Sequence, residues 1–579
     1  MIPVRSYLRL LADYLRRQKL RVASLTITLF TAIGLTLVGP QLVRSFLDRA
    51  IEGSPVDELI PLAVWFMVIA VLQQVFNVTA TYLAEQVGWT ATNEMRADLA
   101  AHVLNLDMGF HKEHTPGEMI ERIDGDVTAQ ADFFSAFAIR VLGNSILMVG
   151  VMVLLWRENM WVGLGITLFF MVALGAMLRI QAWAVPLWKK VRARSAELMG
   201  LIGEQLGGTE DIRGNGGVGY MMRRFTEILR AWLPDQVMGR MGFSALWGTS
   251  IANYIVGTVL VFWLGSFFFN EGTLTLGSVY LIFSYTEMSR RPMEQIREQM
   301  ERFQKAAAGI SRVQGLFDRT SVLDTSGTEV IPEGALRVEL DDVVFGYDDD
   351  VVLDRVSLDL APDRILGVLG RSGSGKTTMA RLLTRLYDPI EGSVRLGGVE
   401  IRGAEIHSLR RRVGMVTQDV QLFRATIRDN LTFFDETIPD SRLHEVLDEL
   451  GLTEWLATMP EGLDTRLEAG GAGLSAGQAQ LLAFTRIFLE NPGLVILDEA
   501  SSRLDPATEK LIERAVDRLL ADRTGIIIAH RLATVTRADD ILILEDGRVI
   551  EYGERVTLAA DPESRLSHLL VTGMEEVLA

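Results

Sequence analysis

Eight residues in the second half of the chain have the types and spacing of a polyphosphate-binding loop. They fit the pattern G-x-x-x-x-G-K-[ST] and are Gly370, Arg371, Ser372, Gly373, Ser374, Gly375, Lys376 and Thr377. Residues 365–369 before them read as a buried strand, and residues 378–387 after them read as a helix. Such a loop points several backbone N–H groups at one cavity. The pattern predicts a nucleoside triphosphate site, with Lys376 near the β- and γ-phosphates and the Thr377 hydroxyl on Mg²⁺.

Polar side chains end three further strand-like runs in this half. They are Asp498 and Glu499 after residues 494–497, Gln418 after residues 413–417, and His530 after residues 525–529. Beside a phosphate loop, we expect Asp498 to hold Mg²⁺ and Glu499 to orient or deprotonate the attacking water. Gln418 can reach the metal or the water, and His530 can reach the γ-phosphate. A lone histidine after a strand is more often structural, so the role expected for His530 depends on the presence of the other motifs.

A second anion-binding helix start is predicted at residues 474–478, which have small side chains and one hydroxyl. Ser475, Gly477 and Gln478 are the candidate ligands there. The first loop already holds the phosphates of one nucleotide. We therefore expect the second segment to serve nucleotide that is bound on another chain.

The first half of the chain is apolar and uncharged over long runs. Of the 579 residues, 49% are hydrophobic, and six runs are long enough to be membrane spans: residues 22–43, 59–84, 133–156, 161–178, 241–269 and 272–286. A single run can be a buried helix of a soluble protein, but six in one half make that interpretation improbable. The net charge of −17 opposes nucleic acid as a partner. The absence of cysteine excludes disulfides and zinc–thiolate sites.

Basic residues set the predicted orientation. They precede the first span and fill the long link between spans four and five, whereas the short links are nearly free of them. Both termini and both long links are therefore expected in the cytoplasm. A break in each link, at residues 107–118 and 213–217, predicts a short transverse helix against a cytosolic partner, although a simple turn remains an alternative. Charged residues near span ends are expected to snorkel to the interface, and they are Arg44, Glu85, Arg140, Arg179 and Glu287.

In this order and spacing, the motifs resemble those of the nucleotide-binding domain of an ABC transporter. The phosphate loop, Gln418, residues 474–478, Asp498 with Glu499, residues 502–505 and His530 correspond to the family's motifs. With six spans ahead of them, the chain resembles an exporter-type (type IV) half-transporter, one subunit of a bacterial heterodimeric multidrug-type exporter.

The resemblance implies a multi-domain membrane protein. A six-helix transmembrane domain with cytosolic extensions and coupling helices occupies residues 1–320. A linker at residues 321–334 leads to an α/β P-loop domain with a helical subdomain at residues 335–579. The implied cofactors are ATP and Mg²⁺, with Tyr347 stacking on adenine and Thr378 also contacting the nucleotide. The implied location is the cell membrane, with multiple passes and the nucleotide-binding domain in the cytoplasm.

The family's mechanism supplies further expectations. Two nucleotide domains close head to tail on ATP, each site combining Lys376 of one chain with Ser475 and Gly477 of the other. Closure turns the membrane cavity outward and exports a small hydrophobic or amphipathic substrate. Hydrolysis, with Lys376, Glu499 and His530 as catalytic residues, allows reset. Asp505 would signal between the sites.

The sequence departs from the family's pattern in the segment at 474–478. Ala476 stands where the family usually has glycine, the residues after Gln478 lack the usual basic side chains, and Arg503 replaces a small residue. These departures favour a heterodimer with a second half-transporter over a homodimer, which stays open. Other functions also stay open: an ATP-gated channel or regulatory subunit, an exporter-fold importer, and a soluble ATPase acting on DNA, which the spans oppose.

Overall fold

The computed structural model describes residues 12, 14–348, 350–417, 420–471, 473–498, 506–528 and 535–572. It divides into two compact units. The helical unit contains Met1–Asn105 and His114–Arg319, and the α/β unit contains Leu106–Glu113 and Thr320–Ala579. The short segment Leu106–Glu113 therefore belongs with the α/β unit, although it lies far from that unit in the sequence.

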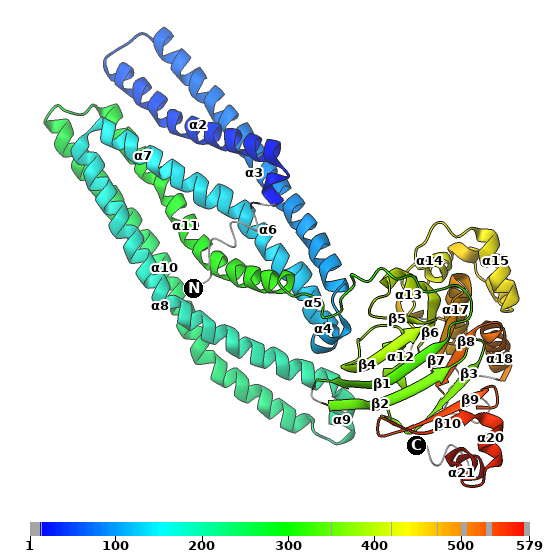
Figure 1. The fold of residues 1–579 in the computed structure, drawn as a ribbon. Coiled ribbons are helices and arrows are strands. Elements are labelled where there is room, and N and C mark those ends of the chain that lie inside the picture. Colours follow the sequence, from blue (N-terminus) through cyan, green and yellow to red (C-terminus); the bar gives the residue numbers. More distant parts are fainter. Residues whose placement is uncertain are drawn as a thin grey trace. The chain divides into compact units, whose positions relative to one another are not determined.

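Long helices build the helical unit, with α2 packed along α3 and α8 along α10 (Figure 1). Its elements are α2 (Lys19–Ile51), α3 (Val56–Leu104), α5 (Pro116–Ile120), the π-helical η1 (Glu121–Asp126), α6 (Val127–Ala136), the π-helical η2 (Phe137–Gly143), α7 (Asn144–Glu158), α8 (Met160–Gly207), α9 (Thr209–Gly214), α10 (Val218–Asn270) and α11 (Leu276–Phe317). Polar caps fix two of the helix starts. The Asn159 side chain accepts a hydrogen bond from the Trp161 N–H at 2.9 Å, and the Thr275 hydroxyl accepts one from the Ser278 N–H at 3.1 Å.

Five helices among the described residues are long and apolar enough to cross a membrane: Lys19–Ile51, Val56–Leu104, Arg140–Glu158, Met160–Gly207 and Val218–Asn270. Four of them contain a whole predicted span, and Arg140–Glu158 contains residues 140–156 of the third predicted span, which starts earlier, in α6. The sixth predicted span falls on α11, which begins at Leu276 rather than at residue 272 because Thr275 caps it. The described part of α11 lacks an apolar run of that length, because the charged residues Glu287, Arg290 and Arg291 fall within five turns of its start.

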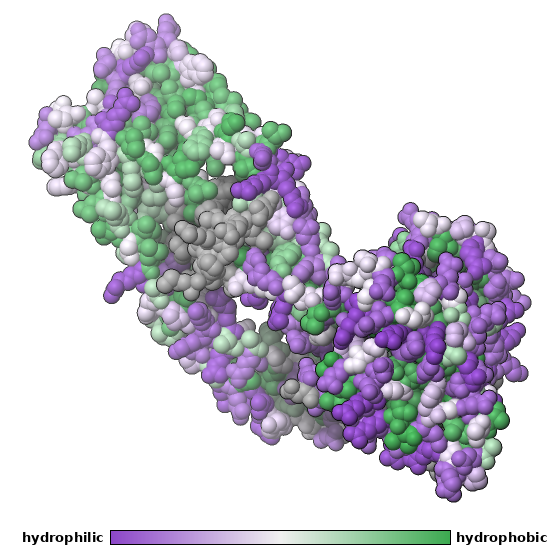
Figure 2. Space-filling model, viewed as in Figure 1, coloured by the Kyte–Doolittle hydropathy of each residue, from purple (hydrophilic) through white to green (hydrophobic). Residues whose placement is uncertain are grey.

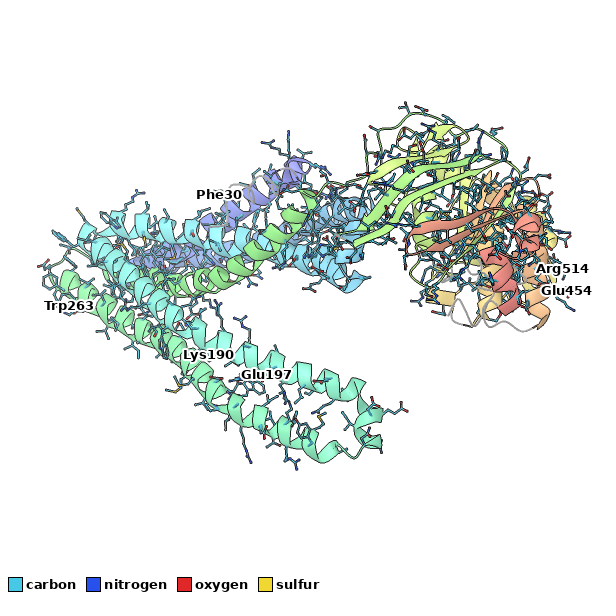
Figure 3. The ribbon with its side chains drawn as sticks, turned by 60° about the horizontal axis from the view of Figure 1, so that its bottom comes forward. Phe30, Lys190, Glu197, Trp263, Glu454 and Arg514 are labelled. Carbon is cyan, nitrogen blue, oxygen red and sulfur yellow. The ribbon has the colours of Figure 1, made fainter. Side chains whose placement is uncertain are left out.

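Hydrophobic residues cover much of the upper part of the helical unit, whereas hydrophilic residues dominate its lower part and the α/β unit on the face shown (Figure 2). Phe30 on α2 and Trp263 on α10 project outward and are 53% and 64% exposed (Figure 3). Lys190 and Glu197 project from the part of α8 beyond its predicted span (Figure 3). Large apolar side chains on an outer surface suit contact with lipid, and charged side chains suit water.

Arg44 differs from the snorkelling side chain that we expected. Its Nη1 donates to Glu158 Oε2 at 2.5 Å, and its Nε lies 3.6 Å from Asp48 Oδ2. The Ser278 hydroxyl donates to Glu158 Oε1 at 2.6 Å. Because Glu158 ends α7 and Ser278 lies in the first turn of α11, this network joins α2, α7 and α11. Glu158 was not singled out in the sequence, since nothing local shows that it faces Arg44.

A second ion pair joins η1 to α11. Asp126 is 5% exposed, and Arg312 Nε donates to its Oδ2 at 2.7 Å while Nη2 bonds to Oδ1. We expect Asp126→Asn to lower the free energy of unfolding by about 2 kcal/mol, because the buried carboxylate loses a two-point bond to a half-exposed guanidinium. Thermal unfolding of the purified chain measures the loss. Asp124→Asn is the matched control, because Asp124 pairs with Arg96 while 70% exposed. Equal Tm values for the two variants would contradict the assignment.

Two sheets form the α/β unit (Figure 1). The antiparallel sheet has the order β2-β1-β4-β5, and the larger sheet has the order β10-β9-β3-β8-β7-β6. Their strands are β1 (Val338–Tyr347), β2 (Asp350–Leu360), β3 (Ile365–Leu369), β4 (Glu391–Leu396), β5 (Val399–Glu400), β6 (Val413–Val416), β7 (Leu494–Asp498), β8 (Thr524–Ile528), β9 (Asp540–Glu545) and β10 (Arg548–Glu554). The neighbours β6, β7, β8, β3 and β9 run parallel. Their apolar runs are buried because both faces of such a sheet are covered.

Helices complete this unit: α4 (Met108–Glu113), α12 (Lys376–Leu383), α13 (Ile406–Arg412), α14 (Ile427–Thr432), α15 (Asp440–Glu449), α16 (Thr453–Ala457), α17 (Ala476–Glu490), α18 (Pro506–Leu520), α20 (Arg555–Ala560) and α21 (Arg565–Thr572). One apolar core lies between the two sheets and α12. Another gathers α14, α15, α16, α17 and α18 beside β6 and β7. This second core is the helical subdomain that the sequence predicted.

Candidate functional site

The topology brings the predicted site residues to one edge of the larger sheet. Strands β3, β8, β7 and β6 are successive parallel neighbours, so their carboxyl ends meet at the same edge. The phosphate loop follows β3, and Asp498 ends β7 level with Ile528 of β8. Gln418, Glu499 and His530 come shortly after the ends of β6, β7 and β8, but they lie outside the described residues. Their predicted roles therefore rest on position along the chain.

Glycine geometry explains why the phosphate loop needs its sequence. Gly375 precedes α12 with φ of +102°, and a Cβ there would lie 2.5 Å from Leu353 Cδ2. Gly370 has φ of +152°, and a Cβ there would lie 2.2 Å from the Leu544 carbonyl oxygen. Neither position accepts a side chain without strain. The loop therefore turns tightly from β3 into α12, as the sequence predicted, although α12 ends at Leu383, earlier than expected.

The lysine of the loop is buried and held by the loop itself. Lys376 is 5% exposed, and its Nζ donates to the carbonyl oxygens of Gly370 at 2.7 Å and Arg371 at 2.9 Å. Ser374 is also buried, and no described residue makes a hydrogen bond to its Oγ. An ammonium group and a buried hydroxyl inside a glycine loop suit an anionic oxygen ligand, because a buried polar group without a partner is costly.

Thr377 and Asp498 meet across the end of the sheet. The Thr377 hydroxyl donates to Asp498 Oδ2 at 3.1 Å, and Asp498 is 8% exposed. Hydroxyl and carboxylate oxygens are the ligands that Mg²⁺ prefers in proteins. These two residues, 121 positions apart, therefore fit the predicted metal site beside the phosphate loop. Their contact depends on the strand order, because β3 and β7 both border β8.

Tyr347, the predicted adenine-stacking residue, ends β1 in an aromatic cluster. Its ring centroid lies 5.1 Å from that of Phe345 and 5.3 Å from that of Tyr387, with the planes nearly perpendicular in both pairs. Its hydroxyl accepts a hydrogen bond from Arg381 Nη1 at 3.1 Å and lies 3.4 Å from Thr378 Oγ1. The ring is therefore fixed between β1 and α12, close to the phosphate loop.

The short helix α4 packs against this cluster from within the same unit. Lys112 Nζ lies 4.7 Å from the Tyr347 ring centroid and 3.7 Å from Asp348 Oδ2. Asp107 accepts hydrogen bonds from the Phe110 and Val322 N–H groups at 3.1 and 3.0 Å. Burial opposes its ionised form, but these backbone bonds outweigh it and hold the pKa of Asp107 below its ordinary value. An anionic Asp107 thus fastens α4 to the segment after Arg319.

We expect Tyr347→Ala to weaken ATP binding about tenfold, because stacking on a base contributes about 1–3 kcal/mol. Titration of the purified chain with a fluorescent ATP analogue measures the dissociation constant. Tyr347→Phe is the matched control, since it keeps the ring and loses only the hydroxyl's hydrogen bonds to Arg381 and Thr378. Unchanged affinity in Tyr347→Ala would remove this ring from the nucleotide site.

The segment at residues 474–478 opens a helix, as predicted. Ser475 is the N-cap of α17: its hydroxyl accepts from the Gln478 N–H at 3.2 Å, and Gln478 Oε1 accepts from the Ser475 N–H at 2.9 Å. This reciprocal capping box fixes the first turn. Ser475 and Ala476 are exposed, whereas Gly477 is buried. The side chains of Ser475 and Gln478 thus already bond to each other's backbone at the start of α17.

Arg486 is a structural link that the sequence did not reveal. From α17 its Nε donates to the Asn430 carbonyl oxygen at 2.6 Å, and its Nη1 donates to the Gln421 carbonyl oxygen at 3.0 Å. Its guanidinium lies 4.6 Å from the Phe433 ring centroid. Burial lowers the pKa of Arg486 to about 10, so it stays charged at neutral pH. Arg486 thus ties α17, whose N-cap is Ser475, to the segment that contains Gln421 and Asn430.

Comparison with known proteins accounts for both units. A family model described as ABC transporter matches residues 353–502, and one described as ABC transporter transmembrane region matches residues 22–293. A putative multidrug export ATP-binding/permease protein of Bacillus subtilis is 30% identical over 552 residues, which cover 92% of this chain and 93% of that protein. The chain is an ABC transporter. It joins the transmembrane and nucleotide-binding domains of an exporter-type half-transporter, as the motifs predicted, and the ABC transporter domain makes it an ATP hydrolase.

Other relatives of this ABC transporter agree with the assignment. An ATP-dependent lipid A-core flippase of Idiomarina loihiensis is 29% identical over 520 residues, 88% of each chain. The solved structure of a bacterial Atm1-family ABC exporter with ATP bound superposes with a TM-score of 0.78 over 96% of this chain and 98% of that one. At 24% identity, that likeness concerns the fold. The predicted fold class, a helical transmembrane domain followed by an α/β nucleotide-binding domain, is thereby confirmed.

Proposed function

We propose that this ABC transporter exports a small hydrophobic or amphipathic substrate by alternating access, driven by ATP binding and hydrolysis. The observation that carries the proposal is the meeting of Lys376, Thr377 and Asp498 at one sheet edge, in a chain that also contains membrane-spanning helices. An energy-converting site and a membrane domain on one polypeptide suit coupled transport. The B. subtilis relative, named as a putative multidrug export protein, supports the direction and the substrate class.

The residues present fit a magnesium nucleotide. Ser374 offers a buried hydroxyl with no partner among the described residues, and Lys376 places an ammonium inside the loop. Thr377 and Asp498 would hold Mg²⁺ between them, with Gln418 as a further ligand. When bound, Mg²⁺ polarises the phosphate oxygens and neutralises their charge. In the same site, Tyr347 and Thr378 would position the nucleoside and the first turn of α12.

The catalytic roles belong to residues at the same edge. Glu499 directly follows Asp498, so its carboxylate would orient the attacking water and accept its proton. His530 follows β8 and would donate a hydrogen bond to the γ-phosphate. Lys376 would stabilise the charge that develops on the phosphate oxygens. For Glu499 and His530, these roles rest on their positions just after β7 and β8 along the chain.

A second chain would complete each nucleotide site. The exposed N-terminus of α17, with Ser475, Gly477 and Gln478, would bind the phosphates held by the partner's loop. The departures at Ala476 and Arg503 favour a second, different half-transporter, and a homodimer is the alternative. We place the transmembrane domain at residues 1–320, the linker at 321–334 and the nucleotide-binding domain at 335–579, with both termini and the nucleotide-binding domain in the cytoplasm.

Transport by inverted membrane vesicles tests the proposal. Vesicles that contain the chain in its native assembly should take up the fluorescent dye Hoechst 33342 when ATP is added, and should not respond to a non-hydrolysable ATP analogue. Hydrolysis without uptake across a panel of hydrophobic and amphipathic probes would contradict export and favour a channel or regulatory subunit. Loss of dye from preloaded vesicles upon ATP addition would indicate import.

A further inference from the structure

Three cations without a carboxylate partner stand on the helix pair α8 and α10. Lys189 and Lys190 of α8 and Arg240 of α10 are exposed. Among the described residues, no carboxylate forms an ion pair with any of the three. Arg194, one turn further along α8, differs from them because its Nη1 lies 2.8 Å from Glu197 Oε2. The chain as a whole has a net charge of −17, so a group of uncompensated cations stands out in it.

Packing of α10 along α8 brings these cations to one level. The two helices are joined through α9 and pack along each other as an antiparallel pair. A Cβ at Gly239 of α10 would lie 2.8 Å from Val191 Cγ2 of α8. In an antiparallel pair, the residue after Gly239 is level with the residue before Val191, and these residues are Arg240 and Lys190. Together with Lys189 they form the cation layer.

The length of uncharged helix on one side of the cation layer matches the thickness of a bilayer. Both helices are long and apolar enough to cross a membrane. From Met160 to Trp188 of α8, Arg179 is the only charged residue, and the stretch is about 43 Å long at 1.5 Å per residue. Residues 241–270 of α10 contain no charged residue and are about 45 Å long. A bilayer with its headgroup regions is about 40–45 Å thick. The cation layer therefore lies at a headgroup surface.

Tryptophans lie on the apolar side of the cation layer. Trp183 stands seven residues before Lys190 and is 49% exposed. Trp247 stands seven residues after Arg240 and is 66% exposed. Seven residues are about two helical turns, so each tryptophan shares a helix face with its cation. Tryptophan rings favour the interface between lipid and water, and long cationic side chains reach back to it.

The side chains of the cation layer on α8 lean toward this interface. Helical side chains point toward the helix N-terminus, and the apolar part of α8 lies N-terminal to Lys189 and Lys190. Membrane orientation by itself requires only an excess of basic residues on one side. Cations from two helices at one level, beside exposed tryptophans, form in addition a surface that suits a negatively charged amphipathic molecule.

We propose that the cation layer binds the phosphate headgroups of anionic phospholipids in the adjoining leaflet, with the acyl chains along the apolar surface of α8 and α10. Charge complementarity selects an anionic lipid over a zwitterionic one, because cations at a membrane surface attract anionic headgroups. The apolar surface selects a lipid over free phosphate, which has no chains to cover Trp183 and Trp247. This inference does not depend on the direction of transport or on the substrate.

Native mass spectrometry of the purified full-length chain tests the proposal. Phosphatidylglycerol and phosphatidylcholine with identical acyl chains are added in equal amounts to the chain in detergent, and the bound lipids are counted. Phosphatidylglycerol should be preferred at least about tenfold, because three cations act on its headgroup. Equal binding of the two lipids, or release of phosphatidylglycerol by an excess of inorganic phosphate, would overturn the proposal.

Matched variants locate the site. Replacing all three residues of the cation layer with glutamine should lower the preference at least about fivefold. Lys189→Arg/Lys190→Arg keeps the charges and should keep the preference. The control, Arg223→Gln/Arg224→Gln/Arg230→Gln, removes three exposed cations of α10 and should keep it as well. These control residues lie at least about 15 Å further from the apolar stretch of α10.

An undiminished preference without the cation layer, or an equal loss in the control, would contradict the site. The same spectra report the oligomeric state of each variant. If the glutamine variant of the cation layer dissociated into single chains while its lipid preference stayed, a second chain rather than lipid would cover this surface, and the proposal would be overturned.

Discussion

Glu499→Gln is expected to slow ATP hydrolysis by about 10²–10⁴-fold while ATP still binds. The reason is positional. All five residues of β7 are buried between β6 and β8, and the last of them, Asp498, reaches Thr377 of the phosphate loop. Glu499 is the next residue along the chain, and its predicted role rests on that position. An amide there keeps the size of the carboxylate but no longer accepts a proton from the attacking water.

Phosphate release by the reconstituted chain measures the rate of ATP hydrolysis, and titration with a fluorescent ATP analogue measures ATP binding. Glu490→Gln is the matched control, because Glu490 ends α17 in an exposed position and should leave both values unchanged. If Glu499→Gln hydrolysed ATP at the wild-type rate, Glu499 would not be the base. If it lost ATP binding as well, the residue would act in the structure of the loop.

The second large effect is expected for Lys376→Met, which should weaken ATP binding about 10- to 100-fold. The ammonium sits inside the loop, bonded to the Gly370 and Arg371 carbonyl oxygens, and supplies positive charge where the phosphates would lie. Methionine fills a similar volume but leaves those carbonyls unpaired and removes the charge. The loss should affect ATP more than adenosine, because adenosine has no phosphates to bind.

Binding of ATP and of adenosine is compared by isothermal titration of wild type and Lys376→Met. Lys510→Met provides the control, since Lys510 is exposed on α18. An equal loss of affinity for ATP and adenosine would indicate that the substitution disorders the whole site. Unchanged ATP affinity would place the phosphates elsewhere.

Local patterns predicted the phosphate loop and the start of α17 because their chemistry is local. Gly370 and Gly375 adopt backbone angles that other residues avoid, and Ser475 caps a helix three residues before Gln478. Such requirements appear directly in the order of residues. The buried parallel strands could also be predicted from the sequence, since such strands are continuous apolar runs.

Contacts between distant residues were not predictable in this way. Lys112 lies over Tyr347, and Arg44 pairs with Glu158, although more than 100 residues separate the members of each pair. The hydrophobic periodicity of a sequence does not indicate which charged residues will face each other in the fold. The network on α11 is a further example: packing of α10 against α11 brings Ser250 to Glu294 and places Arg290 between Glu287 and Glu294.

The central claim of the proposed function is that ATP switches the transmembrane domain between inward-open and outward-open states. Because the chain contains no cysteine, a single Thr286→Cys variant places one thiol in the lining of a pocket between α8, α10 and α11. A membrane-impermeant maleimide is applied to sealed vesicles of either orientation, with and without ATP and vanadate. We predict labelling from the cytoplasmic face without nucleotide and from the opposite face with ATP and vanadate. Labelling that stays on one face, or that occurs from both faces in the same state, would contradict the account.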